Sequence, residues 1–137
     1  MWQREERERK SKPLFFLNLN QRYEIYVDMV RYLEDVLKIG EKKFNVNVLI
    51  FDNGCFLSLS EGKERIGAFT LSLPSLHGKP EVYEIMQVRY GKLLANVLAQ
   101  KLSEKFKGIS IVSVSFSSEL SNDEVREVLR KVKEMVE

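Results

Sequence analysis

The sequence predicts a mixed α+β domain: a single, mostly antiparallel sheet of about five strands with three flanking helices, in the order β-α-β-β-β-α-β-α. Two patterns carry this prediction. Short runs in which apolar and polar residues alternate are typical of half-buried strands, and longer segments repeat apolar residues at the spacing of a helix face. The length of 137 residues is that of one domain. We therefore expect a charged, flexible arm at residues 1–13 and a single α/β domain over residues 14–137.

The first half of the chain is expected to supply four strands and one helix. Residues 14–20 (LFFLNLN) are a short apolar run typical of a strand. Residues 22–39 are expected to form a helix because six apolar residues recur at helical spacing: Tyr26, Met29, Val30, Leu33, Val36 and Leu37. Three strands then follow as an antiparallel meander at residues 44–51, 55–61 and 65–73, and Asn53-Gly54 is a strong hairpin signal between the first two.

The segment after the meander is expected to be a loop that leads into a helix. Residues 74–80 contain two prolines and a glycine, which is typical of a loop. A short turn at residues 81–88 precedes the main helix, with Gly91 marking the break between them. Apolar residues at helical spacing then continue through Phe106.

The C-terminal part is expected to be a strand followed by a helix. Residues 109–117 (ISIVSVSFS) alternate between apolar residues and serines, as a half-buried strand does. Ser121 and Glu124 have the spacing of a capping box, in which each side chain bonds the other residue's backbone N–H. This signal begins a last helix that reaches the C-terminus.

Charge excludes several classes of partner and location. Lys and Arg total 22 against 20 Asp and Glu, and the surplus of +2 lies within residues 1–13. The folded part therefore lacks the basic surplus typical of nucleic-acid-binding domains, and nucleic-acid binding through the arm is the weaker alternative. No apolar run is long enough to span a membrane, and we expect no signal peptide. One unpaired cysteine fits the cytoplasm. Four glutamines among abundant Lys and Glu are typical of a thermophilic source.

Catalytic and cofactor chemistry has little support. One Cys and one His exclude a disulfide framework and a Cys/His zinc site. They leave Cys55 and His77 as one candidate nucleophile–base pair. The simpler interpretation is that Cys55 is a small buried residue and His77 a solvated loop residue. No glycine-rich phosphate loop joins a strand to a helix. We expect no enzyme activity, no cofactor and no metal.

One pattern suggests a partner-binding face. Small hydroxyl residues occupy the register opposite the predicted core on three strands: Ser58, Ser60, Thr70, Ser72, Ser113 and Ser115. Two interpretations stay open. The face is either an ordinary solvated sheet surface or a flat surface against which another chain packs. Trp2 in the charged arm is similarly either a docking anchor or an incidental tail residue.

The second half of the chain resembles the small proteasome-assembly chaperones, specifically the third and fourth members of that family. The resemblance covers about residues 44–137 and is carried by four segments: Ile66–Leu73 (IGAFTLSL), Leu93–Lys105 (LLANVLAQKLSEK), Ile109–Phe116 (ISIVSVSF) and Ser121–Val136 (SNDEVREVLRKVKEMV). Residues 1–40 have no counterpart in the pattern of elements that carries this resemblance. The chain ends in Met135-Val136-Glu137, where members of the broader group carry a hydrophobic residue, a tyrosine and any residue to dock into the α-ring.

The resemblance implies a non-enzymatic α/β chaperone of archaeal type that forms oligomers. Such a protein binds a proteasome α-type subunit or another assembly-chaperone homologue, and it acts as an assembly or scaffold subunit. A roadblock-like or profilin-like regulatory module that dimerises and binds a GTPase-type partner is the alternative, because those folds also combine a central sheet with flanking helices.

Overall fold

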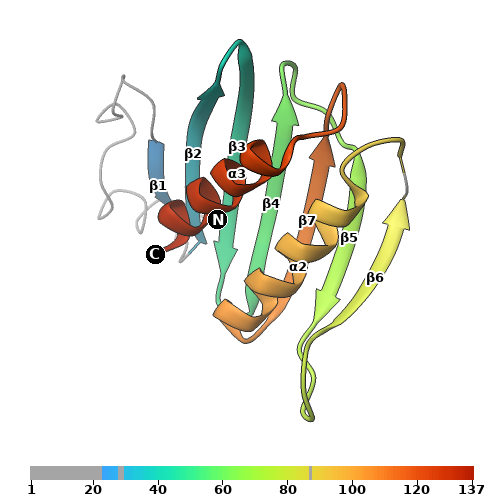
Figure 1. Cartoon of the computed structure of the whole chain (residues 1–137). Coiled ribbons are helices and arrows are strands. Elements are labelled where there is room, and N and C mark those ends of the chain that lie inside the picture. The colour runs from blue at the N-terminus through green and yellow to red at the C-terminus, as the bar shows by residue number, and fades with distance from the viewer. Residues whose placement is uncertain (1–22, 28–29, 87) are drawn as a thin grey trace.

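The computed structural model describes residues 23–27, 30–86 and 88–137. Within them, one sheet of seven strands carries two helices (Figure 1). The spatial order of the strands is β1-β2-β3-β4-β7-β5-β6. The strands are β1 (Tyr23–Val27), β2 (Val30–Ile39), β3 (Lys42–Phe51), β4 (Gly54–Glu61), β5 (Ala68–Leu73), β6 (Glu81–Met86) and β7 (Ile109–Ser115), and the helices are α2 (Lys92–Phe106) and α3 (Asn122–Val136).

Both helices lie on the same face of the sheet (Figure 1). α2 packs over β4, β5 and β7, and α3 packs over β2. We call the face that carries the helices the helix face of the sheet. The hydrophobic core fills the space between this face and the helices. The largest fully buried side chains are Leu33, Phe44, Val46, Val48, Leu57, Leu59, Leu98, Val112, Val114, Val128 and Met135. No described helix covers the opposite face, which we call the open face.

The mixed, mostly antiparallel sheet is confirmed, but the meander is wrong at its third strand. β3 and β4 form the predicted antiparallel hairpin. β7 then lies between β4 and β5, parallel to the first and antiparallel to the second. The start of β7 passes so close to the start of β4 that a Cβ on Gly54 would lie 1.8 Å from the carbonyl oxygen of Ile109. A Cβ on Gly108 would lie 2.1 Å from the carbonyl oxygen of Asn53. Glycine is therefore required in both segments where they pass each other, at positions 54 and 108.

The predicted helix at residues 22–39 is wrong, because this segment forms the hairpin of β1 and β2. The buried residues of β2 are Leu33, Asp35 and Leu37, which alternate with half-buried neighbours as in a strand. Asp35 interrupts the apolar alternation because its carboxylate is paired with Lys131 of α3, at 2.7 Å. The remaining apolar residues then mimic helical spacing. Gly40 takes φ 61° in the turn between β2 and β3.

The predicted turn at residues 81–88 is also wrong, because residues 81–86 form the edge strand β6, paired with β5. Its two glutamates hide the alternation. Glu84 is polar because it meets α2: its carboxylate accepts a hydrogen bond from Asn96 at 3.0 Å and lies 3.3 Å from Lys92 Nζ. The count of five strands and three helices therefore becomes seven and two in the described part of the chain.

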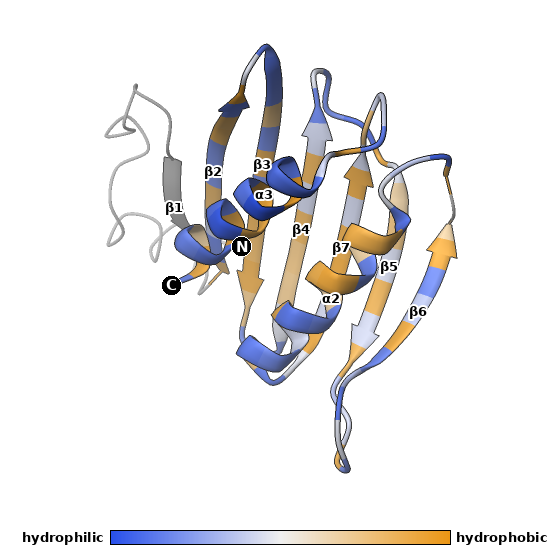
Figure 2. Ribbon diagram, viewed as in Figure 1, coloured by the Kyte–Doolittle hydropathy of each residue, from blue (hydrophilic) through white to orange (hydrophobic). Residues whose placement is uncertain are grey.

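The other predicted elements are found close to their expected bounds. The strands at 44–51, 55–61 and 109–117 correspond to β3, β4 and β7, and the third meander strand shortens to β5. α2 begins after Gly91 and ends at Phe106, as predicted. Figure 2 shows that α2 is hydrophobic at its start and hydrophilic toward its end. The capping box of α3 is confirmed, with Ser121 N donating to Glu124 Oε1 at 2.8 Å. The predicted strand at 14–20 lies outside the described residues.

We expect that removing one partner of the Asp35–Lys131 ion pair destabilises the fold more than removing both partners. Replacing Asp35 with Ala leaves the ammonium of Lys131, whose side chain is 16% exposed, without its counter-charge. The free energy of unfolding should fall by about 3–5 kcal/mol, measured by urea denaturation. The double variant Asp35→Leu with Lys131→Met should recover most of that loss. Arg126→Ala on the outer surface of α3, which breaks a solvent-exposed pair, is the control and should change nothing measurable. Equal losses at both pairs would contradict the prediction.

Gly54→Ala should destabilise the fold more than Gly40→Ala. Both positions have positive φ, at 155° and 61°, so both variants suffer backbone strain of about 1–2 kcal/mol. At Gly40 the added methyl meets nothing within 4 Å, whereas at Gly54 it overlaps the backbone of β7. The overlap should add about 1–3 kcal/mol or more. Thermal unfolding of the two variants measures the difference, and equal midpoints would show that the strand crossing relaxes freely.

Candidate interaction surface

The open face of the sheet divides into a polar half and an apolar half. The polar half lies under the β4–β5 loop at residues 62–67. Asn45 Nδ2 donates to the carbonyl of Gly62 at 2.6 Å, and Asn47 Nδ2 donates to Glu64 Oε1 at 2.8 Å. Ser60 Oγ donates to the carbonyl of Arg65 at 3.1 Å. The loop is therefore attached to the sheet by side chains from two strands.

Tyr32 and Ser113 extend this polar network across the face. The hydroxyl of Tyr32 donates to Asn47 Oδ1 at 2.8 Å. Burial, with the carboxylates of Glu34 and Glu64 nearby, raises the pKa of Tyr32 to about 12. Ser113 Oγ on β7 accepts from Gly67 N at 3.0 Å. Donors and acceptors at this end are thus paired within the chain, which leaves few for a partner.

The apolar half begins where the loop ends and reaches the β3–β4 turn. Cross-strand pairing places Leu49 opposite Phe56, Phe56 opposite Ile111 and Ile111 opposite Leu71. Phe56 and Phe69 meet edge to face with ring centroids 6.1 Å apart. The outermost members are strongly exposed, at 60% for Ile85. We call this surface the apolar sheet patch, and its members are Leu49, Phe51, Phe56, Phe69, Leu71, Leu73, Tyr83, Ile85, Met86, Ile109 and Ile111.

The six predicted hydroxyl residues do not share one face. Ser58, Ser60, Ser113 and Ser115 lie on the open face, where the register places Ser58 opposite Ser113 and Ser60 opposite Ser115. Ser60 and Ser113 are buried beneath the loop, at 0% and 1% exposure. A role in partner binding for these four stays a prediction.

Thr70 and Ser72 lie on the helix face, which corrects the prediction. Thr70 pairs with the core residue Val112 and donates its hydroxyl to Asn96 Oδ1 of α2 at 3.0 Å. Ser72 is fully buried opposite Ser110. Alternation along β5 is real but its orientation is inverted: the apolar residues Phe69, Leu71 and Leu73, expected in the core, point to the open face. The residues that sequence reasoning missed are therefore those of the apolar sheet patch. A signal for them was available, because Ser72 of β5 and Ser110 of β7 occupy positions that face the helices.

Cys55 and His77 are not arranged as a nucleophile and its base. Cys55 is 5% exposed on the helix face, and its burial raises the pKa of the thiol to about 12. His77 is exposed in the β5–β6 loop, where its backbone N–H donates to Ser75 Oγ at 3.3 Å. A buried, protonated thiol is a poor nucleophile at neutral pH.

The described residues also offer no metal centre and no membrane-spanning element. No group of three or more His, Cys, Asp or Glu side chains among them is arranged to hold a metal ion. No helix in the described part of the chain is long and apolar enough to cross a membrane.

The fold is similar to that of a solved chaperone complex. The structure titled "Crystal Structure of a Novel Chaperone Complex for Yeast 20S Proteasome Assembly" contains a chain that superposes with a TM-score of 0.58 at 14% sequence identity. The match covers 78% of this chain and 92% of that chain. No family model matches the sequence, and no curated protein matches it. The likeness establishes a shared α+β fold with an assembly-chaperone subunit, and it does not favour the roadblock-like or profilin-like alternative.

We expect Cys55 to resist alkylation in the native protein. With a pKa of about 12, the thiolate fraction at pH 8 is on the order of a thousandfold below that of a free cysteine. Labelling with iodoacetamide, followed by intact mass measurement, should therefore be negligible in native buffer and complete in 6 M guanidinium, a strong denaturant. Rapid native labelling would show instead that the thiol is accessible and ionised.

Proposed function

We propose that this chain is a non-enzymatic protein-binding factor that acts in proteasome assembly, as a chaperone or scaffold subunit. Its partner is a proteasome α-type subunit or a second assembly-chaperone homologue, and it works in the cytoplasm as part of an oligomer. The observation that carries the proposal is the apolar sheet patch on a chain with the fold of an assembly-chaperone subunit. The thermophilic, archaeal origin expected from the composition stays a prediction.

The composition of the patch supports packing against a protein. Aromatic, aliphatic and methionine side chains from β3, β4, β5, β6 and β7 form one continuous surface. Burying apolar surface contributes roughly 25 cal/mol for each Å² removed from water. Contiguous apolar patches of this kind on a sheet are typical of protein interfaces. A small-molecule site would instead be concave, whereas this patch lies on the face of a sheet.

The geometry supports a partner that is itself flat or convex. A second sheet packs face to face at a spacing of about 10 Å, with side chains of both sheets interdigitating. The β4–β5 loop at residues 62–67 stands over one end of the open face, so a packed partner is confined to the apolar half. Phe51 and Ile85 lie toward opposite sides of that half, on β3 and β6. They are suitable anchors, because exposed large side chains contribute most when an interface buries them.

A carboxylate introduced into the apolar sheet patch should weaken partner binding, because the interface would bury its charge without a partner. Phe51→Glu and Ile85→Glu change residues that are 43% and 60% exposed, so the fold should be retained. The dissociation constant of the complex should rise at least about thirtyfold, the effect of losing roughly 2 kcal/mol at an anchor. The measurement is native mass spectrometry and biolayer interferometry of the purified chain, alone and with purified proteasome α-type subunits.

Leu76→Glu is the matched control, because Leu76 is 94% exposed in the β5–β6 loop outside the patch. This variant should keep wild-type binding and the wild-type oligomer. A protein that stays monomeric and binds neither an α-type subunit nor an assembly-chaperone homologue would refute the proposed function. Complexes that survive both patch variants would keep the function but move the interface elsewhere.

A further inference from the structure

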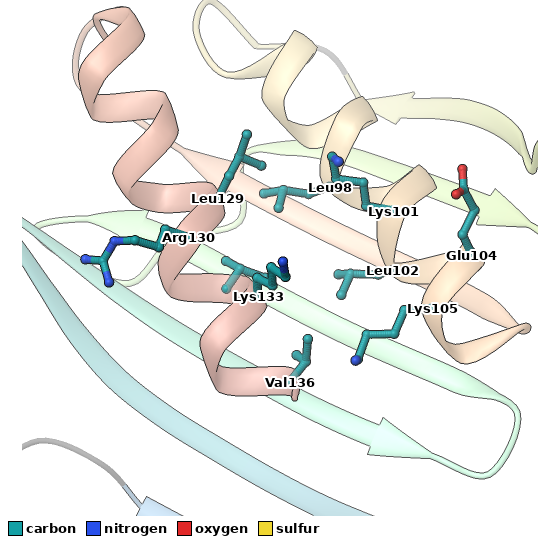
Figure 3. A pocket seen from close by; sticks show the side chains of 10 residues that line it. Leu98, Lys101, Leu102, Glu104, Lys105, Leu129, Arg130, Lys133 and Val136 are labelled. Atoms are coloured by element: carbon teal, nitrogen blue, oxygen red, sulfur yellow. The ribbon is translucent and has the colours of Figure 1, made fainter.

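A groove runs between α2 and α3 on the helix face of the sheet (Figure 3). Its larger part has a volume of about 590 Å³ and lies between the C-terminal halves of the two helices. Leu98 and Leu102 of α2 and Leu129 of α3 project toward it in Figure 3. A second hollow of about 440 Å³ continues toward the helix N-termini, and Leu129 lines both parts. The two helices therefore enclose a trough with an apolar floor along their length.

The rim of the larger hollow carries unpaired positive charge on its α2 wall. Four cations, Lys101, Lys105, Arg130 and Lys133, stand against one carboxylate, Glu104. Arg130 is bound to Glu127 and Glu134 at 2.8 and 3.3 Å, and Lys133 lies 4.0 Å from Glu137. Lys101 and Lys105 are exposed on α2, and within the described residues neither has a hydrogen-bond or ion-pair partner. The groove thus combines an apolar floor with unpaired positive charge on one wall.

We propose that this groove binds an acidic amphipathic helix of a partner protein. Complementary charge selects an acidic segment, and the apolar floor selects one with leucine-like residues on one side. The walls are side chains of two helices, whose backbone groups are already used within each helix. A helix, which satisfies its own backbone hydrogen bonds, therefore loses less than an extended peptide does when its inner side is removed from water. Residues 1–13 of this chain carry five basic and three acidic residues, so their charge does not fit.

The site is separate from the interface of the proposed function. The groove lies on the helix face, and the apolar sheet patch lies on the open face of the same sheet. One chain can therefore contact a packed partner through its sheet and a helical segment through its helices. The two surfaces can be disrupted one at a time.

The test measures binding of a designed peptide to the full-length chain by fluorescence polarisation. The probe is a fluorescein-labelled 15-residue peptide, the length of α2, with leucines at i, i+3, i+4, i+7 and i+11 and glutamates on its other side. We expect saturable binding that weakens as salt increases. Lys101→Glu combined with Lys105→Glu should raise the dissociation constant about tenfold or more. Leu129→Asp should weaken binding through the floor, and circular dichroism checks that each variant is folded.

Lys63→Glu combined with Lys79→Glu is the matched control, since both lysines are exposed in loops outside the groove. It should leave the affinity within about twofold, because distant surface charges are screened. Phe51→Glu should also leave it unchanged, which separates this site from the proposed function. Absence of saturable binding would overturn the proposal, as would equal affinity for a peptide of the same composition with scattered leucines. Tighter binding of a uridine oligonucleotide that the lysine variant abolishes would reassign the groove to nucleic acid.

Discussion

The insertion of β7 between β4 and β5 is the constraint on which the rest of this structure depends. β7 is the last strand in the chain but occupies the middle of the sheet, and β5 and β6 join the other strands only through it. The insertion requires two backbones to pass closely at Gly54 and Gly108, where Ile109 N donates to Asn53 O at 2.8 Å. It also positions the helices: α2 must cross from the β6 edge to the centre, and α3 must return from the centre toward β2. Both crossings take place on one face.

Placing both helices on one face produces two surfaces of different character. On the open face, no described helix covers the aromatic and aliphatic side chains of five strands. On the helix face, α2 and α3 cover different strands and leave a groove between them. The apolar half of the open face suits a packed domain. The groove has an apolar floor and unpaired lysines on its α2 wall, which suits a single acidic helix. The two proposed interactions follow from the same topology and use different physical forces.

Much of the fold was predictable because most elements carry their own local signal. The Asn-Gly hairpin, the Ser121–Glu124 capping box and the apolar stripe of α2 all depend on residues within one element. Prediction was wrong where a distant partner changes the meaning of a residue. Asp35 reads as solvent-exposed until Lys131 of α3 is placed 2.7 Å away, and Glu84 reads as part of a turn until Asn96 and Lys92 of α2 reach it. Both acids lie in strands that contact a helix far along the chain.

The candidate site was harder to predict than the fold. The alternation of apolar and polar residues shows which residues share a face of a strand, but it does not show which face is buried. A strand such as β5 reads equally well with Phe69 and Leu71 inward or outward, and the neighbouring strand decides between them. Here the neighbour is β7, whose Val112 and Val114 face the helices and bring Thr70 and Ala68 of β5 to the same side. Thr70 then bonds Asn96 of α2, and the larger apolar residues are directed to the open face. Thr70 and Ser72, whose hydroxyls marked a surface in the sequence, thus lie in the interior. The surface that we propose for a partner is made by apolar side chains that no described helix covers.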